Sequence, residues 1–182
     1  MTDPNQIPNY KRPALNRPEL RQRLEQQIPL FDFEAFGTWK LVLKHFRVEP
    51  GKKNQPYYMA TVRILESDNA AWPVDRMANL WFPIGRGPTP TDKFRGEKDD
   101  RRLTAFILAV YRIGAGVPFD VEKGLDDLIA QGKVESDALV FTYRRVADPY
   151  VQKVLHPVTK EVIQEVERTG AKEFFDPVVA AA

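Results

Sequence analysis

Apolar and polar residues alternate along three stretches in the first half of the chain, and this period of two predicts three β-strands. The stretches are residues 38–48, 57–66 and 76–82. In the first of them the apolar residues change face partway, because Leu41 and Leu43 share one side of the predicted strand whereas Phe46 and Val48 share the other. A long strand that bends at a β-bulge would produce this change, and small closed barrels use such strands to turn corners.

A period of three to four residues follows the strands and predicts two helices. The first covers residues 99–114, where the apolar positions are Leu103, Phe106, Ile107, Val110 and Ile113. The second and shorter helix covers residues 121–131. Residues 83–100, before the first helix, include three prolines and three glycines and are predicted to form a long loop.

The two ends of the chain carry weaker patterns. Prolines at positions 4, 8 and 13 predict an extended arm over residues 1–17, and a short helix follows to about residue 28. Near the other end, residues 138–146 alternate as a strand, and residues 150–168 read as a hairpin that turns at HPVTKE. Residues 169–182 lack periodicity and are predicted to be a flexible tail.

The predicted order is therefore three strands, two helices, one strand and a hairpin. Strands that do not alternate with helices argue against a parallel α/β sheet. The order predicts a mainly β fold, namely a five-stranded Greek-key barrel of the OB-fold type with added helices, an extra hairpin and extended termini. The expected division is an N-terminal arm and helix at 1–30, an OB-fold-like domain at 31–168 and the tail at 169–182.

The formal net charge of the 182-residue chain is only +2, yet its charges are segregated. Residues 38–64 carry six basic side chains and one acidic one, hence +5, whereas residues 119–137 carry six acidic and two basic ones, hence −4. Such blocks predict one basic face and one acidic face. The basic block covers the first two predicted strands and the turn between them, and we call it the basic ribbon.

Several classes of function lack their sequence signals. The chain has no cysteine, which excludes disulfides and thiolate metal sites, and neither His45 nor His156 has a second histidine at zinc-ligand spacing. No nucleophile-elbow, phosphate-loop or dinucleotide motif occurs. The sequence therefore predicts a protein that is not an enzyme and that needs no metal or cofactor. No apolar run approaches the ~20 residues of a membrane span and no secretory signal opens the chain, so the cytoplasm is the expected location.

Single-stranded nucleic acid requires cations that follow the phosphates and exposed rings that stack on the bases. The basic ribbon interleaves both kinds of residue, and neighbouring segments add more. The cationic candidates are Lys40, Lys44, Arg47, Lys52, Lys53, Arg63, Arg86, Lys93, Arg95 and Arg145. The candidate rings are His45, Tyr57, Trp72, Trp81, Phe94 and Tyr143. Together these residues predict a groove for single-stranded DNA or RNA.

Three of the candidate rings have a competing structural assignment. Tyr143 shares a strand face with Phe141, which favours burial in the core. Trp72 can cover one end of the barrel. Trp81 lies in the segment LWF, where adjacent residues point to opposite faces, so its ring could point to the core or to solvent.

Six segments of residues 33–146 share their spacing and hydrophobic rhythm with a known family. They are FEAFGTWKLVL, YYMATVRILES, LWFPIGR, RRLTAFILAVYRIGAG, LIAQGKV and LVFTYRRV. The series resembles phage-encoded OB-fold single-stranded DNA-binding proteins, in which a Gly-aromatic strand opens the barrel and a helix precedes a GK turn into the last barrel strand. The resemblance implies binding with little sequence preference, a role in DNA replication, recombination or repair in the cytoplasm of a bacterial host, and no cofactor.

Proteins of that family often end in an acidic tail that is closed by an aromatic residue. This chain ends instead in KEFFDPVVAAA, with its two phenylalanines inside the segment. Five acidic and two basic residues in 161–182 predict a tail that competes with phosphates for the basic groove or binds replication or recombination proteins. Packing of Phe174 or Phe175 onto the barrel is the alternative. The sequence leaves open whether the protein is a monomer or a homodimer.

A second class of function remains open. A small barrel whose basic ribbon docks an acidic protein, such as a phage inhibitor of a host enzyme or a virion component, would carry the same charges. The two classes differ in how many rings are exposed along one basic groove, because stacking on bases requires such rings and a charge patch does not.

Overall fold

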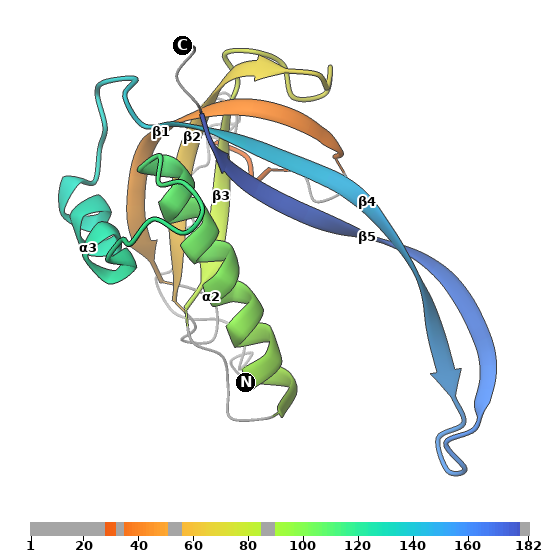
Figure 1. The fold of residues 1–182 in the computed structure, drawn as a ribbon. Coiled ribbons are helices and arrows are strands. Elements are labelled where there is room, and N and C mark those ends of the chain that lie inside the picture. Colours follow the sequence, from red (N-terminus) through yellow and green to blue (C-terminus); the bar gives the residue numbers. More distant parts are fainter. Residues whose placement is uncertain (1–27, 32–34, 51–55, 85–89, 179–182) are drawn as a thin grey trace, which may run out of the picture.

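The structure is a computed structural model that describes residues 28–31, 35–50, 56–84 and 90–178, with side chains from residue 95 onward in the last range. Figure 1 shows the arrangement of the elements. The strands are β1 (Gly37–Glu49), β2 (Tyr57–Ser67), β3 (Met77–Pro83), β4 (Val140–Leu155) and β5 (Val162–Pro177). The helices are α2 (Pro90–Val110) and α3 (Val121–Gln131).

The predicted fold class is confirmed. The protein is mainly β, with a five-stranded antiparallel sheet in the order β3-β2-β1-β4-β5 and two helices between β3 and β4. The sheet curls in the manner of a barrel wall (Figure 1). Within the described residues β3 and β5 do not pair, so the barrel is not closed. We call this gap between β3 and β5 the seam.

Strand β1 bends where the sequence predicts it to bend. Its register with β2 shifts between Lys40 and Leu41 and again between Leu43 and His45. After the second shift the side chain of Phe46 returns to the core, where it is fully buried. The irregularity therefore lets the curved strand keep apolar residues inside from Trp39 to Phe46.

Helix α2 covers the seam and supplies the centre of the core. It packs against β3, β4 and β5. The ring of Phe106 on this helix contacts rings from four strands, with centroid distances of 4.9–5.9 Å to Phe46, Phe82, Phe141 and Phe175. Helix α3 starts at the predicted position because the side chain of Asp120 accepts a hydrogen bond from the backbone N–H of Lys123.

The prediction of a long loop over residues 83–100 is wrong for its second half. Helix α2 begins at Pro90, a residue that is compatible with the first turn of a helix. Residues 95–100 are polar apart from Gly96, and most of their side chains are exposed, so this part of the helix has no apolar stripe. A helix that extends past the core in this way gives no periodic signal in the sequence.

The C-terminal third also differs from the prediction. The strand expected at 138–146 and the hairpin expected at 150–168 are one long hairpin, β4–β5, which runs far beyond the sheet (Figure 1). Residues 169–177, expected to form a flexible tail, are the second half of β5. Phe175 is buried beneath α2, so this segment is part of the core.

Residues 1–27, which include the predicted N-terminal arm and most of the predicted helix at 18–28, lie outside the described residues. The short segment that follows lies along β3, where the N–H of Phe31 donates to the carbonyl of Asn79 at 2.9 Å and the N–H of Asn79 donates to the carbonyl of Pro29 at 2.8 Å. Among the described residues there is no helix of the length and apolar character that a membrane span requires.

Candidate nucleic-acid interface

The strand register gathers two aromatic residues on the outer face of the sheet. Tyr57 of β2 and Trp81 of β3 are both partly exposed, and their ring centroids lie 6.1 Å apart in an edge-to-face arrangement. Met59 pairs with Trp81 on one side and with Arg47 on the other. The outer face therefore presents an aromatic pair on an apolar and cationic base.

A cleft of about 400 Å³ lies next to this pair, along the seam. We call it the seam cleft. It is lined by Trp81, Pro83, Arg95, Lys98, Asp99, Arg102 and Glu173. The four residues that α2 contributes are spaced i, i+3, i+4 and i+7, so they occupy one helix face. Arg95 and Lys98 are exposed. The cleft thus places Trp81 beside two accessible cations.

Arg102 closes the inner side of the seam cleft. Its guanidinium forms an ion pair with Glu173 of β5, donates to the backbone carbonyl of Trp81, and lies 4.5 Å from the ring centroid of Phe82. Tyr143 donates a further hydrogen bond to Glu173, with an O···O distance of 2.6 Å. These contacts join the two strands that the sheet itself leaves unpaired, and they fix the backbone that carries the Trp81 ring.

The electrostatics of this cluster favour a charged Glu173. Burial by itself would raise the pKa of the Glu173 carboxyl, but the positive charge of Arg102 and the hydrogen bonds from Arg102 and Tyr143 outweigh it, so the pKa is lowered. Burial and the neighbouring carboxylate raise the pKa of the Tyr143 hydroxyl, which keeps it a hydrogen-bond donor. The cluster therefore consists of a charged Arg102–Glu173 pair and a Tyr143 hydroxyl that donates to the same carboxylate.

The four cations of the basic ribbon that the structure describes are held by acidic partners. Lys40 pairs with Glu66 at 2.9 Å, and Arg47 pairs with Glu49 and also donates to the hydroxyl of Thr61 at 2.9 Å. The two carboxylates offset charge that the ribbon is expected to offer to phosphates. Arg47 is in addition one of the less exposed cations, because its side chain lies across the strand surface.

Asp137 holds two further ribbon cations at once. Its carboxylate accepts from Lys44 at 2.8 Å and from Arg63 at 2.6 Å, and Asp75 lies 3.3 Å from the same arginine. The hydrogen bonds from Lys44 and Arg63 lower the pKa of the Asp137 carboxyl. Asp137 comes from the acidic block 119–137, so the fold brings the two predicted opposite faces together at this point instead of keeping them apart.

His45 is engaged in the sheet. It forms an isolated antiparallel bridge with Lys133, and its Nδ1 lies 3.3 Å from Nη1 of Arg47. Partial burial, followed by the charges of Arg47 and Lys133, lowers the pKa of the imidazole. Within the described surroundings His45 is a sheet residue that contacts a cation rather than a free stacking platform.

Three predicted site residues are buried, and their assignment to the groove is corrected. Trp72 is 4% exposed because it stacks on Phe31, with ring centroids 4.5 Å apart. Tyr143 is 1% exposed and belongs to the core, in agreement with its competing assignment. Arg145 is 6% exposed, on the same inner face as Tyr143. None of the three is available to a ligand on the outer face.

The remaining candidates divide into two groups. Arg95, a predicted groove residue, lines the seam cleft. It lies on helix α2 and not in the predicted loop. Lys52, Lys53 and Arg86 lie outside the described residues, and of Lys93 and Phe94 the structure describes only that they belong to α2. Lys98 and Arg102 are not among the predicted site residues. The predicted boundary between loop and helix separates Lys98 from Arg102, so the helical spacing that aligns both with Arg95 is not visible in the predicted elements.

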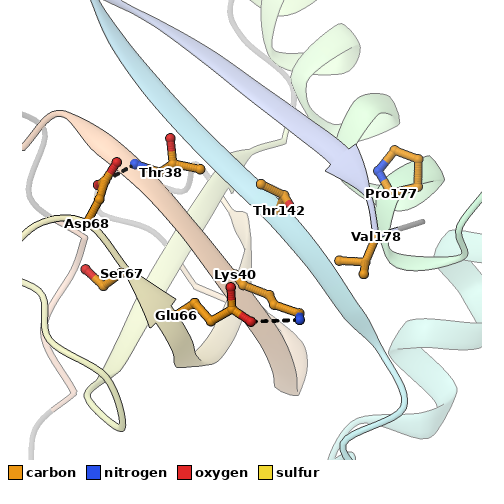
Figure 2. A pocket seen from close by; sticks show the side chains of 8 residues that line it. All are labelled: Thr38, Lys40, Glu66, Ser67, Asp68, Thr142, Pro177 and Val178. Carbon is orange, nitrogen blue, oxygen red and sulfur yellow. Dashed lines mark hydrogen bonds and ion pairs between the residues drawn. The ribbon is translucent and has the colours of Figure 1, made fainter. Parts of the chain in front are cut away.

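A second cleft, of about 490 Å³, lies on the outer face between β1, β2 and β4 (Figure 2). It is lined by Thr38, Lys40, Glu66, Ser67, Asp68, Thr142, Pro177 and Val178. The pair of Lys40 and Glu66 crosses it, and Asp68 accepts from the backbone N–H of Thr38 at 2.8 Å. Among the described residues no aromatic side chain lines it, so these residues offer no surface on which a base could stack.

The sequence matches no family model and no curated protein. The outer face and the seam cleft are therefore the features of the molecule that indicate a function. Among the described residues, no three histidine or acidic side chains come together in a way that could hold a metal ion.

Proposed function

We propose that this protein binds single-stranded DNA with little sequence preference. In this proposal the bases stack on Trp81 and Tyr57, and the phosphates meet Arg95 and Lys98. The observation that carries it is the position of Trp81, which is partly exposed beside a second ring and lines a cleft with two exposed cations. Rings beside cations are the combination that single strands require.

The size and openness of the surface support a strand rather than a small molecule. The aromatic pair lies on the outer face of the sheet, and the cations are exposed on a helix beside the sheet edge, so an extended strand can contact both. A strand laid across β3 would place one base on the indole and its phosphate near α2. RNA offers the same rings and phosphates, so it is the nearest competing ligand.

The ion pairs of the basic ribbon change the proposed path. Lys40, Lys44, Arg47 and Arg63 each have an acidic partner, so they contribute less to binding phosphates than their number suggests. The same ion pairs weaken the alternative in which the ribbon docks an acidic protein. That alternative depends on the charge of the ribbon alone, and the ion pairs reduce this charge. The resemblance to phage single-stranded DNA-binding proteins suggests a role in replication, recombination or repair.

The proposal is tested by measuring the fluorescence anisotropy of labelled oligo-dT, oligo-rU and duplex DNA with the full chain at several salt concentrations. Two to five phosphate contacts predict that log K falls with log salt with a slope of about −1.4 to −3.5, since each contact on a single strand contributes ~0.7. Affinity should be higher for oligo-dT than for duplex DNA. A slope near zero, or equal affinity for duplex and single strand, would contradict the proposal.

A further inference from the structure

The hairpin β4–β5 projects well beyond the sheet as a two-stranded ribbon (Figure 1). Strand β4 pairs with β1 only from Val140 to Arg145. Beyond Arg145 the described residues of the hairpin pair only with each other, so both edges of residues 146–172 are open. We call this part the arm. Its ten residues of β4 span about 33 Å at ~3.3 Å per residue, and an isolated two-stranded ribbon is marginally stable in water.

Aliphatic side chains collect at the far end of the arm. Their exposed fractions range from 48% to 80%, and they are Val151, Leu155, Val158, Val162 and Ile163. Exposed apolar groups at this density on one short hairpin mark a surface that another molecule covers. Open strand edges without such cover are also a risk for aggregation.

The charges of the arm argue against nucleic acid as the molecule that covers it. Residues 146–172 contain four basic and four acidic side chains, so their net charge is zero with histidine neutral. A surface that follows phosphates, or that binds an anionic lipid headgroup, requires an excess of cations. A neutral ribbon with exposed aliphatic residues fits a protein surface instead.

One face of the arm carries both signs of charge next to its apolar residues. Alternation places Val151, Lys153 and Leu155 on the same face of β4, and the register places Glu167 opposite Val151 and Glu165 opposite Lys153. Lys153, Glu165 and Glu167 are exposed and form no ion pair within the described residues. A face of this kind is complementary to a second copy of itself, turned around a two-fold axis.

We propose that the arm binds the arm of a second copy of this chain, face to face, to form a homodimer. The aliphatic residues of the two arms cover each other, and Lys153 of each copy lies against Glu165 or Glu167 of the other. A face about 33 Å long and about 10 Å wide gives a total buried area below the ~1,200 Å² of standard interfaces, so the dimer is weak and depends on concentration. This contact is independent of the seam cleft.

Sedimentation velocity of the full chain tests the proposal over a concentration range of about 5 to 500 µM, where a weak dimer changes from dissociated to associated. The natural sequence should shift from monomer to dimer, and the double variant Leu155→Asp/Ile163→Asp should stay a monomer. Val117→Asp is the matched control, because Val117 is 54% exposed but lies on the body of the molecule. A natural chain that stays a monomer throughout, or arm variants that dimerise as before, would overturn the proposal, and the former result would point to a foreign partner.

A charge exchange distinguishes this pairing from non-specific association. Lys153→Glu makes the face wholly acidic, and Glu165→Lys/Glu167→Lys makes it wholly basic, so each variant alone should associate at least several-fold more weakly than the natural chain. An equimolar mixture of the two should recover dimers, because opposite charges then face each other across the two-fold axis. Failure of the mixture to associate, with both variants folded by circular dichroism, would contradict the face-to-face arrangement.

Discussion

Arg102 and Glu173 form a two-pronged ion pair across the seam, with Nε 2.6 Å from Oε2 and Nη2 3.1 Å from Oε1. In a closed barrel, backbone hydrogen bonds would join β3 to β5. Here Arg102 joins them instead, because its guanidinium pairs with Glu173 of β5 and donates to the backbone carbonyl of Trp81 on β3. The strand that carries the proposed ligand-binding ring is thus held by a partly buried ion pair as well as by the sheet.

The pH dependence of stability should report this pair. The pKa of Glu173 in the folded protein is below its usual value of 4.5, so the contribution of the charged form is present in full above about pH 4.5 and is lost as the pH falls through the folded-state pKa. The variant Glu173→Gln should be less stable at pH 7, because Arg102 loses its charged partner, and its stability should decline less steeply below about pH 4.5.

Urea unfolding between pH 3 and pH 7 measures both effects, a range that brackets the ordinary pKa of a carboxyl group. Glu66→Gln is the control, because it removes a carboxylate from an ion pair whose acidic side chain is 70% exposed. Its profile should follow that of the natural protein. If Glu173→Gln and the natural chain show the same pH profile, the seam pair does not contribute to stability.

Two neighbouring phenylalanines of β5 should respond differently to truncation. Phe175 lies in the core, so Phe175→Ala is expected to lower the free energy of unfolding by ~3–5 kcal/mol. Phe174 is 37% exposed and its ring centroid lies 4.3 Å from the guanidinium of Arg144, a contact worth ~0.5–1 kcal/mol at an exposed site, so Phe174→Ala should cost much less. Equal losses of unfolding free energy for the two variants in urea titrations would contradict the placement of Phe175 in the core.

The cations of the seam cleft should contribute to the salt dependence of DNA binding. Arg95→Glu/Lys98→Glu is expected to weaken oligo-dT binding and to make the salt slope shallower by about 1.4, because each lost contact removes ~0.7. Arg101→Glu/Lys123→Glu is the control with the same change of net charge, since both residues are exposed and neither lines the cleft. If both double variants bind alike, only the overall charge matters and the cleft is not the path.

Asp137 offers a test of whether the basic ribbon takes part. Asp137→Ala releases Lys44 and Arg63 from their shared partner and removes a negative charge from the outer face. If the strand also crosses the ribbon, the variant should bind oligo-dT more tightly and steepen the salt slope by up to about 1.4. An unchanged slope and affinity in the anisotropy titration would place the ribbon outside the binding path.

The sequence predicts the elements with a strong periodic signal and fails where the signal is absent. The strand at 57–66 and the helix at 121–131 match β2 and α3 closely, because each has one buried face and clear ends. The start of α2 was missed because its first turns extend past the core and are polar on all sides. The second half of β5 gives no clear signal because Phe175 is its only buried side chain, so the segment shows no sustained alternation.

Much of the candidate site could not be predicted because it depends on contacts between distant segments. The cationic character of the ribbon is visible in the sequence, but its neutralisation is not, because Asp137 lies 93 positions from Lys44 along the chain. The cleft beside Trp81 likewise arises from β3, α2 and β5 together. Tyr57 and Trp81 were both predicted, whereas their adjacency follows only from the register of β2 and β3.

The most direct test of single-strand binding at Trp81 is a titration of intrinsic tryptophan fluorescence with oligo-dT. Of the three tryptophans, Trp39 and Trp72 are buried, so quenching by a stacked base should come from Trp81. Stacking of bases on Trp81 predicts saturable quenching by oligo-dT and little by duplex DNA. Trp81→Phe should lose most of the quenching, and Trp81→Ala should weaken binding about fivefold to a hundredfold with the fold retained, which corresponds to ~1–3 kcal/mol for one stacked base. Binding that leaves the fluorescence unchanged, or no binding at all, would contradict single-strand binding at Trp81.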